Sequence, residues 1–262
     1  MDQHLYSSIK FKKELGQNFL CDKETANLMV NTLHPEKTDV VLEIGPGAGI
    51  LTSILAKKVE KVFAIEFDRD LIPTLKNNLQ GLTNVEIENQ DILKYLSQTK
   101  AENKIIPFGK ILGSLPYQIT SPLLHLIAKT PYWKKATILI QKEVAEKITA
   151  KPPKSNYLAT FLNRYAKIEI VKIVPKNYFF PMPKVDGAIV TLEKKEVSTD
   201  PKEVERWSNF LHQGFRFPKK MLNKPFEEKA LTLAGIDPTR RPGTLLTEEW
   251  ERLYNRLGNK NE

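Results

Sequence analysis

Strand-like and helix-like segments alternate along residues 39–148, and this pattern constrains the fold more than any other feature of the chain. Short apolar runs rich in Val and Ile are followed by stretches whose apolar residues recur at helical spacing. The expected strands are residues 39–45, 61–66, 84–91, 109–117 and the start of 135–148, and the expected helices are 50–59, 70–79, 121–129 and the end of 135–148. The alternation predicts an α/β fold with a mostly parallel sheet and helices on both faces.

The pattern changes in the second half of the chain. Residues 167–175 and 186–195 are strand-like with little room for a helix between them, so we expect an antiparallel pair at one edge of the sheet. Residues 196–205 are polar and have the composition of a linker, and from Trp207 onward apolar residues recur at helical spacing. The sequence therefore predicts two domains, residues 1–195 and a small helical domain of residues 196–262.

Composition excludes several classes of protein. Cys21 is the single cysteine, so no intramolecular disulfide can form, and the four histidines show no metal-ligand spacing. No apolar run approaches the roughly 18 residues of a membrane span. The first 13 residues lack the apolar block of a secretory signal. We expect a cytoplasmic protein without a metal, and a monomer, because no heptad pattern is present.

Positive charge is concentrated in the second half of the chain. The formal net charge is +9, and residues 1–150 carry 19 Lys and Arg against 17 Asp and Glu, whereas residues 151–262 carry 21 against 14. A basic domain favours a polyanionic partner, because Lys and Arg near phosphates release counterions. A basic protein without a nucleic-acid role remains an alternative on charge alone.

Glycine-rich and acidic residues follow the first three expected strands. The turn Gly45-Pro46-Gly47-Ala48-Gly49 allows close approach of a ligand, but its spacing is not the G-x-G-x-x-G of dinucleotide sites. Glu66 ends the second strand and can accept both hydroxyls of a ribose, and Asp91 ends the third and can accept from an adenine amine. Together they predict an adenosine-binding pocket. The alternative is a tight turn with two solvated acids.

The fourth strand ends in Ser114-Leu115-Pro116-Tyr117, where a different chemistry is possible. Backbone carbonyls at Leu115 and Pro116 can accept protons from an amine, and the ring of Tyr117 can stack on an extruded base. The alternative is an ordinary β-turn before a capped helix.

Four motifs resemble the ribosomal RNA adenine dimethyltransferases in order and spacing. They are LGQNFL (15–20), LEIGPGAG (42–49), SLPY (114–117) and FFPMPKVDG (179–187). The family includes the KsgA/RsmA enzymes and the Erm resistance methylases. The segments FRFPKKMLNKP (215–225) and RRPGTLLTEEW (240–250) are similar to the C-terminal domain of the KsgA/RsmA branch. The resemblance covers nearly the whole chain.

This resemblance implies a fold, an activity and roles for individual residues. The fold would be a Rossmann-like class I methyltransferase sheet, mostly parallel with one antiparallel edge strand. The activity would be methyl transfer from S-adenosyl-L-methionine, leaving S-adenosyl-L-homocysteine, to N6 of two adjacent adenosines near the 3′ end of small-subunit (16S) rRNA in ribosome biogenesis. The implied cofactor-binding residues are Gln17, Asn18, Leu20, Gly45, Gly47, Glu66, Asp91 and Ser114. The implied catalytic residues are Ser114, Leu115, Tyr117 and Phe179, with Tyr117 and Phe179 on either side of the target adenine.

Two positions depart from the family pattern. Ser114 stands where the family has a catalytic Asn, and Gly187 stands where it usually has Ser. A serine hydroxyl reaches less far than an amide, so a ribosome-assembly factor with weak or no catalysis is one alternative. A second is an Erm-like enzyme that methylates 23S rRNA.

Basic residues near aromatic ones form candidate contacts to the small ribosomal subunit and its rRNA. Such side chains track phosphates, while aromatic rings stack on bases or fill the core. The candidates are Lys12, Lys13, Arg216, Lys219, Lys220, Lys224, Arg240 and Arg241. The alternative is that these charges are merely solvated.

Overall fold

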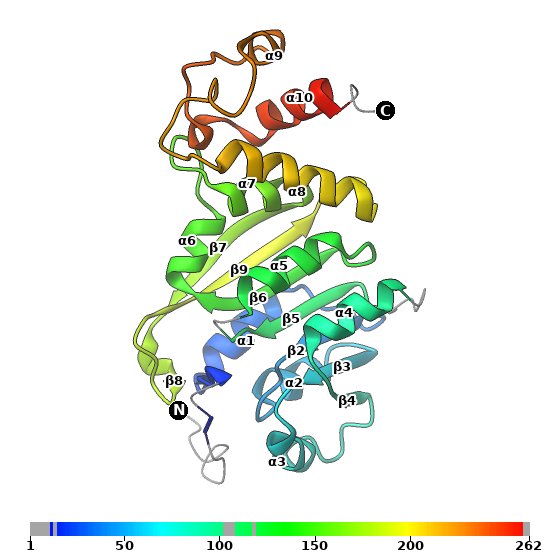
Figure 1. Ribbon diagram of the computed structural model, residues 1–262. Helices are drawn as coiled ribbons and strands as arrows, with labels where there is room; N and C mark the ends of the chain where they lie inside the picture. Colours follow the sequence, from blue (N-terminus) through cyan, green and yellow to red (C-terminus); the bar gives the residue numbers. More distant parts are fainter. Residues whose placement is uncertain (1–10, 13–14, 102–107, 117–118, 259–262) are drawn as a thin grey trace. The chain divides into compact units, whose positions relative to one another are not determined.

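A computed structural model describes residues 11–12, 15–101, 108–116 and 119–258 and divides the chain into two compact units. The first unit comprises residues 1–145 and 168–194, and the second comprises residues 146–167 and 195–262. The main strands are β2 (Val40–Ile44), β3 (Lys61–Glu66), β4 (Val85–Asn89), β5 (Lys110–Ser114), β6 (Lys135–Gln141), β7 (Ala166–Val174) and β9 (Gly187–Lys194). They form one seven-stranded sheet in the order β4-β3-β2-β5-β6-β9-β7 (Figure 1).

The direction of the strands confirms the predicted α/β sheet. Strands β4, β3, β2, β5 and β6 pair in parallel. Strand β9 is antiparallel to β6, with Gln141 opposite Gly187 and Lys135 opposite Glu193. Strand β9 lies beside β7, so the expected pairing of these two segments at one end of the sheet is also confirmed.

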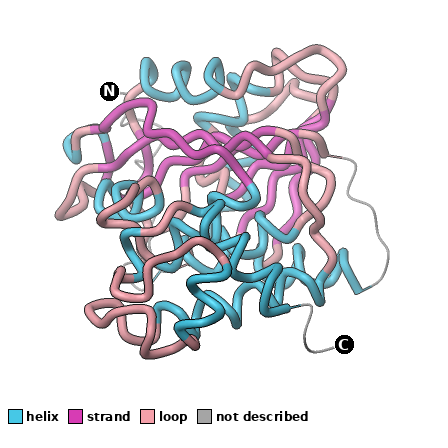
Figure 2. The backbone as a smooth tube through the Cα atoms, turned by 90° about the horizontal axis from the view of Figure 1, so that it is seen from above, coloured by secondary structure: helices cyan, strands magenta, loops and turns pink. Residues whose placement is uncertain are grey.

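Helices connect the strands of the first unit. They are α1 (Lys23–Thr32), α2 (Ile50–Leu55), η3 (Arg69–Leu71), α3 (Ile72–Asn78), α4 (Ile92–Ala101), α5 (Thr120–Lys129), α6 (Lys142–Ile148) and η4 (Lys176–Tyr178). Parallel crossovers are right-handed, so α2 and α3 cover one face and α4 and α5 the other. Figure 2 shows the strands as one layer with helices on both sides. The direction of winding reverses between β2 and β5, which makes the crevice at their carboxyl ends the expected ligand site.

A second, two-stranded sheet joins two motifs that lie far apart in the sequence. Strand β1 (Phe19–Leu20) pairs antiparallel with β8 (Phe179–Phe180), with Phe19 opposite Phe180 and Leu20 opposite Phe179. The backbone N–H of Cys21 extends this contact by donating to the carbonyl of Tyr178 at 2.8 Å. Leu20 and Phe179 both belong to the buried core that includes residues of α1, α2 and the main sheet.

The second unit is helical and has an aromatic core. Its elements are α7 (Tyr157–Tyr165), α8 (Pro201–Phe215), α9 (Glu228–Leu233), η5 (Pro242–Thr244) and α10 (Thr247–Gly258). Trp207 and Trp250 are fully buried, and the Phe210 ring contacts both of them.

The second unit also contains a segment that precedes the expected boundary at residue 195. Residues 146–167, which the sequence pattern places with the first domain, group with the second unit because α7 packs on α8 and α10. Arg164 makes this contact specific: its guanidinium lies 2.8 Å from the Glu203 carboxylate and 4.6 Å from the Trp207 ring centroid.

Candidate cofactor and methyl-transfer site

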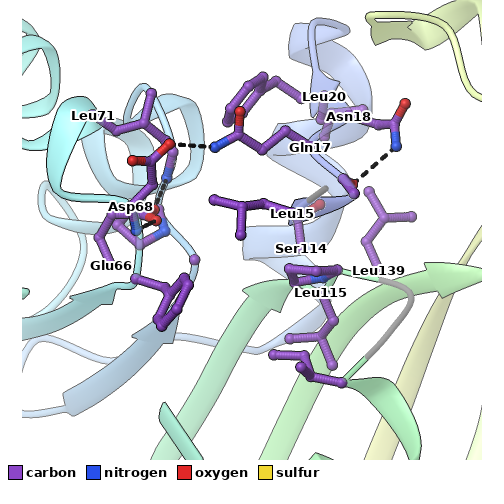
Figure 3. A pocket seen from close by; sticks show the side chains of 18 of the residues that line it. Leu15, Gln17, Asn18, Leu20, Glu66, Asp68, Leu71, Ser114, Leu115 and Leu139 are labelled. Atoms are coloured by element: carbon purple, nitrogen blue, oxygen red, sulfur yellow. Dashed lines mark hydrogen bonds between the residues drawn. The ribbon is translucent and has the colours of Figure 1, made fainter. Parts of the chain in front are cut away.

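A cavity of about 390 Å³ opens at the carboxyl ends of the strands in the first unit (Figure 3). Its volume falls in the roughly 300–1,000 Å³ range of small-molecule sites. Its lining comes from the N-terminal segment, the glycine turn and the start of α2, the chain after β3, β4 and β5, and parts of β6 and β8. Ten residues predicted from the sequence line it: Gln17, Asn18, Leu20, Gly45, Gly47, Glu66, Asp91, Ser114, Leu115 and Phe179.

The glycine turn after β2 lies too close to its neighbours to carry side chains without movement. Gly45 and Gly47 have φ values of +67° and +59°, in the left-handed region that favours glycine. A Cβ atom at Gly47 would lie 2.8 Å from two carbons of the Phe19 ring, and one at Gly45 would lie 3.4 Å from the carbonyl oxygen of Ser114. Glycine is therefore required at Gly47 both by the backbone and by the N-terminal segment that passes over the turn.

Glu66 presents a fixed and buried carboxylate at the end of β3. Its side chain accepts hydrogen bonds from the backbone N–H of Gly47 at 3.0 Å and of Asp68 at 2.8 Å. Burial raises the pKa of Glu66 above its usual value, and these backbone donors oppose part of the rise. Each carboxylate oxygen has a second lone pair, so the group retains acceptor capacity toward the cavity.

Asp68 and Gln17 connect the N-terminal segment to the loop after β3. The Gln17 amide donates to the Asp68 carboxylate at 2.6 Å, as Figure 3 shows, and the Lys12 ammonium donates to the other oxygen at 2.6 Å. Burial alone would raise the pKa of Asp68, but hydrogen bonds from Lys12 and Gln17 outweigh burial and lower it. Gln17 thus lines the cavity while its amide is engaged by Asp68, and Asn18 donates to the Gly16 carbonyl at 3.0 Å.

Asp91 lies between β4 and α4. One of its carboxylate oxygens accepts from the backbone N–H of Leu93 at 2.8 Å, a contact typical of a residue at the start of a helix. The neighbouring Ile92 and the exposed ring of Phe67 line the same part of the cavity. The arrangement combines a carboxylate with apolar side chains, as a flat heterocycle with an amine would require.

The bend after β5 brings Ser114, Leu115 and Pro116 to the cavity wall. The Leu115 N–H donates to the Leu139 carbonyl at 2.9 Å, which fixes the bend against β6. The Pro116 carbonyl accepts from the Thr120 hydroxyl at 3.1 Å and so contributes to the start of α5. Tyr117, the fourth residue of the motif, lies outside the described residues.

Phe179 reaches the same cavity from β8. Its ring is 6% exposed and lies close to Gly187, where a Cβ atom would come within 2.9 Å of the Phe179 ring. Gly187 therefore makes room for the position that Phe179 occupies. The adjacent Phe180 and Met182 are exposed, at 37% and 61%.

The motifs converge in one cavity, and comparison with known proteins identifies the family that they characterise. A model of the family described as ribosomal RNA adenine dimethylase matches residues 8–258. The chain belongs to this family. Proteins named ribosomal RNA small subunit methyltransferase A are similar to it along most of their length. The one from Clostridium botulinum strain Okra is 36% identical over 93% of both chains, and that from Shouchella clausii is 37% identical over 94% of this chain and 89% of the relative.

Solved structures of the dimethylase family's relatives share the fold. A dimethyladenosine transferase from Plasmodium falciparum superposes with a TM-score of 0.78 at 25% identity, covering 92% of this chain and 98% of that one. The 23S rRNA methyltransferase ErmE superposes with a TM-score of 0.73 at 28% identity, covering 92% and 100%. The Rossmann-like class I methyltransferase fold expected from the sequence is thereby confirmed.

The basic residues predicted to contact RNA differ in their surroundings. Arg216, Lys219, Lys220, Lys224 and Arg241 are exposed in the second unit. Arg240 is instead held by Glu249 at 2.6 Å, and the Lys12 ammonium lies 2.6 Å from Asp68 and 2.7 Å from Asp70. Those two charges therefore have partners within the protein. Lys13 lies outside the described residues.

One ionisable residue of the dimethylase motif lies outside the cavity lining. Glu43 on β2 is fully buried, and its two carboxylate oxygens and the Thr52 hydroxyl have no hydrogen bond of good geometry. Burial raises the pKa of Glu43 to about 8, and the nearby Thr52 offsets part of the rise. Glu43 is therefore largely protonated at neutral pH, which avoids an uncompensated buried charge.

Sequence reasoning did not identify Asp68 and Phe67 of this dimethylase site. Both line the cavity directly after Glu66, and Asp68 is the residue that holds the N-terminal segment. Phe67 and Asp68 follow Glu66, the predicted acidic end of a strand, by one and two residues, and this position could have marked them as candidates.

In the described part of the chain, no group of three or more His, Cys, Asp and Glu is placed to hold a metal ion. None of the helices described there combines the length and apolar character needed to cross a membrane.

Proposed function

We propose that this chain transfers methyl groups from S-adenosylmethionine to N6 of adenosines in small-subunit rRNA, at two adjacent positions near the 3′ end. The observation that carries the proposal is the single cavity in which the glycine turn, Glu66 and Asp91 meet Ser114 and Phe179. The glycine turn, Glu66 and Asp91 suit an adenosine-containing cofactor, whereas Ser114 and Phe179 suit the amine and ring of a target adenine. Relatives that are 36–37% identical over most of their length are named for methylation of small-subunit rRNA.

The residues present fit the cofactor. Gly45 and Gly47 line the cavity without side chains, so a ligand can approach the backbone of this turn closely. Glu66 is oriented by two backbone amides, so its remaining lone pairs can accept ribose hydroxyls, and Asp91 can accept from the adenine amine. When bound, S-adenosylmethionine supplies a methyl group on a positively charged sulfur.

The chain's own residues then orient the target amine. The N6 lone pair is delocalised into the adenine ring, and acceptors that receive the amine protons favour attack by nitrogen. Ser114 and the backbone carbonyl of Leu115 are the acceptors that we assign to this role, while Phe179 supports the base by stacking. The bound cofactor would supply the methyl group to N6, while Ser114 and the Leu115 carbonyl hold the amine in place and the proton released from N6 would pass to solvent. Positioning supplies much of the acceleration, because no strong base must act before attack.

Incubation of the protein with labelled S-adenosylmethionine and unmethylated small subunits tests this function. We expect label in the RNA, and mass spectrometry of RNA fragments to find dimethyladenosine at two adjacent positions. Label in large-subunit RNA would instead support the 23S alternative suggested by the likeness to ErmE. Cofactor binding without any incorporated label would support an assembly factor, which the replacement of the family Asn by Ser114 favours.

Ser114→Asn is expected to leave the methyl-transfer rate unchanged or to raise it. An amide carbonyl reaches further than a hydroxyl and is a stronger dipole toward the amine protons. The measurement is single-turnover methylation of small subunits at saturating cofactor. A rate reduced tenfold or more, in a variant that binds the cofactor normally, would contradict the place given to Ser114.

Charge reversal at Lys219 and Lys220 is expected to weaken binding to small subunits and to flatten its salt dependence. Both side chains are exposed, and each phosphate that is no longer neutralised reduces the slope of log K against log salt by about 0.7–0.9. Filter binding at several salt concentrations measures both effects. The matched control, reversal of the exposed Lys154 and Lys202 in the same unit, makes the same change in net charge. Equal effects of the two double variants would remove Lys219 and Lys220 from the interface.

A further inference from the structure

Asp68 occupies an unusual position, because both of its carboxylate oxygens are engaged by the N-terminal segment. Lys12 donates to one oxygen and Gln17 to the other, each at 2.6 Å. The backbone N–H of Lys12 also donates to the Gln17 side-chain oxygen at 2.8 Å, which closes a ring of three residues. The Asp68 side chain is only 3% exposed, whereas the Lys12 side chain is 29% exposed, so these contacts are partly shielded from water. Charge-assisted hydrogen bonds are stronger than those between neutral groups.

The same residue also fixes the ribose-binding carboxylate. The backbone N–H of Asp68 donates to Glu66 at 2.8 Å, while its side chain holds Lys12 and Gln17. Asp68 therefore connects Glu66 at the end of β3 to the N-terminal segment that lines the cavity.

The N-terminal segment is attached at two ends. Residues 15–20 all line the cavity, and Phe19 lies against Gly47 of the glycine turn. At its far end the segment pairs with β8 through Phe19 and Leu20. At its near end the described contacts with the loop after β3 are those of Lys12 and Gln17 with Asp68, together with an ion pair between Lys12 and the exposed Asp70.

We propose that Asp68 is a positioning residue that, through Lys12 and Gln17, fastens residues 15–20 beside the bound cofactor and so sets how long the cofactor remains. Movement of this segment away from the cavity breaks two partly buried hydrogen bonds to Asp68, so these bonds oppose release of the ligand. The inference rests on the proposed use of S-adenosylmethionine. It adds a residue whose effect is on retention of the cofactor rather than on methyl transfer itself.

The test compares Asp68→Asn with Asp70→Asn in the full-length protein. Asp70 is a matched control, because it also contacts Lys12 at 2.7 Å but its side chain is 74% exposed and it does not line the cavity. Exposed ion pairs contribute little, whereas buried bonds to a charged group contribute more. We expect the dissociation rate of S-adenosylmethionine, measured by stopped-flow displacement with excess S-adenosylhomocysteine, to rise about tenfold or more in Asp68→Asn. In Asp70→Asn it should change by less than about twofold.

Two further measurements separate positioning from general damage. In Asp68→Asn, the KM for S-adenosylmethionine should rise by a larger factor than the single-turnover rate at saturating cofactor falls. Gln17→Leu, which leaves Asp68 in place, should also raise the dissociation rate. This variant is the alternative test if Asp68→Asn fails to fold. Combining the two substitutions should add little, because both break the same contact.

Three outcomes overturn the inference. They are equal dissociation rates in Asp68→Asn and Asp70→Asn, no change in Gln17→Leu, or a reduced single-turnover rate with normal retention of the cofactor. If the wild-type protein binds no S-adenosylmethionine, the proposed function fails as well. Normal binding and turnover by wild type with unaltered retention in the variants would reject the role of Asp68 alone.

Discussion

Gly47→Ala is expected to reduce the affinity for S-adenosylmethionine by about 30-fold or more, the factor that ~2 kcal/mol produces. A Cβ atom at this position would lie 2.8 Å from the Phe19 ring, so either the ring or the turn must move. Movement of the ring displaces a wall of the cavity, and movement of the turn breaks the bond from the Gly47 N–H to Glu66. Isothermal titration calorimetry measures the change.

Gly81→Ala is the control for the backbone strain in this substitution. Gly81 also has a positive φ, +84°, but a Cβ atom there would meet nothing within 4 Å. Both variants therefore lose about 1–2 kcal/mol of stability from the left-handed conformation, and only Gly47→Ala also displaces Phe19. Equal losses of affinity in the two variants would show that strain, rather than the contact with Phe19, explains the effect.

Glu43→Gln is expected to remove a large pH dependence of stability. Burial raises the pKa of Glu43 to about 8 in the folded protein, whereas an unfolded glutamate titrates near 4.3. Between these values the folded state binds one proton more than the unfolded state, so the free energy of unfolding falls as pH rises. At about 1.4 kcal/mol per pKa unit, the loss is on the order of 3–5 kcal/mol by pH 8.5.

Urea unfolding at pH 5, 6.5 and 8.5, followed by circular dichroism, measures this dependence. Glutamine resembles the protonated acid, so the variant should match wild type near pH 5 and be the more stable protein at pH 8.5. Glu86→Gln, at an exposed position on β4, is the control and should follow the wild-type curve. Parallel curves for wild type and Glu43→Gln would mean that Glu43 is paired in a way that the structure does not show.

Local sequence patterns predicted the sheet well because the apolar residues of each strand show, within the strand itself, that it is buried. The segment 61–66 was predicted to the residue, and the other main strands within a few residues, since apolar β-branched runs bounded by glycine and polar turns are hard to place elsewhere. Glu66 and Asp91 could be assigned to one site because parallel strands end at the same edge. The glycine turn after the first predicted strand was assigned to the same site for the same reason.

Other features depend on contacts between distant residues and had no local signal. The pairing of Phe19 with Phe180 joins positions 161 residues apart, and neither strand exceeds two residues. The expected first domain, residues 1–195, includes the segment of helix α7, although this helix packs on α8 and α10 in the second unit. Arg240 was predicted to contact RNA from its charge alone, and its pairing with Glu249 could not be deduced without the fold.

Because β1 pairs with β8, one small molecule that separates these strands could disturb both the proposed cofactor site and the proposed adenine site. Leu20 belongs to the segment beside the cofactor cavity and Phe179 to the wall assigned to the target base, and they are opposite each other in a ladder of only two residue pairs. A compound that wedges between these strands has few hydrogen bonds to replace. It would compete with neither the cofactor nor the RNA, so a high concentration of either would not reverse the inhibition.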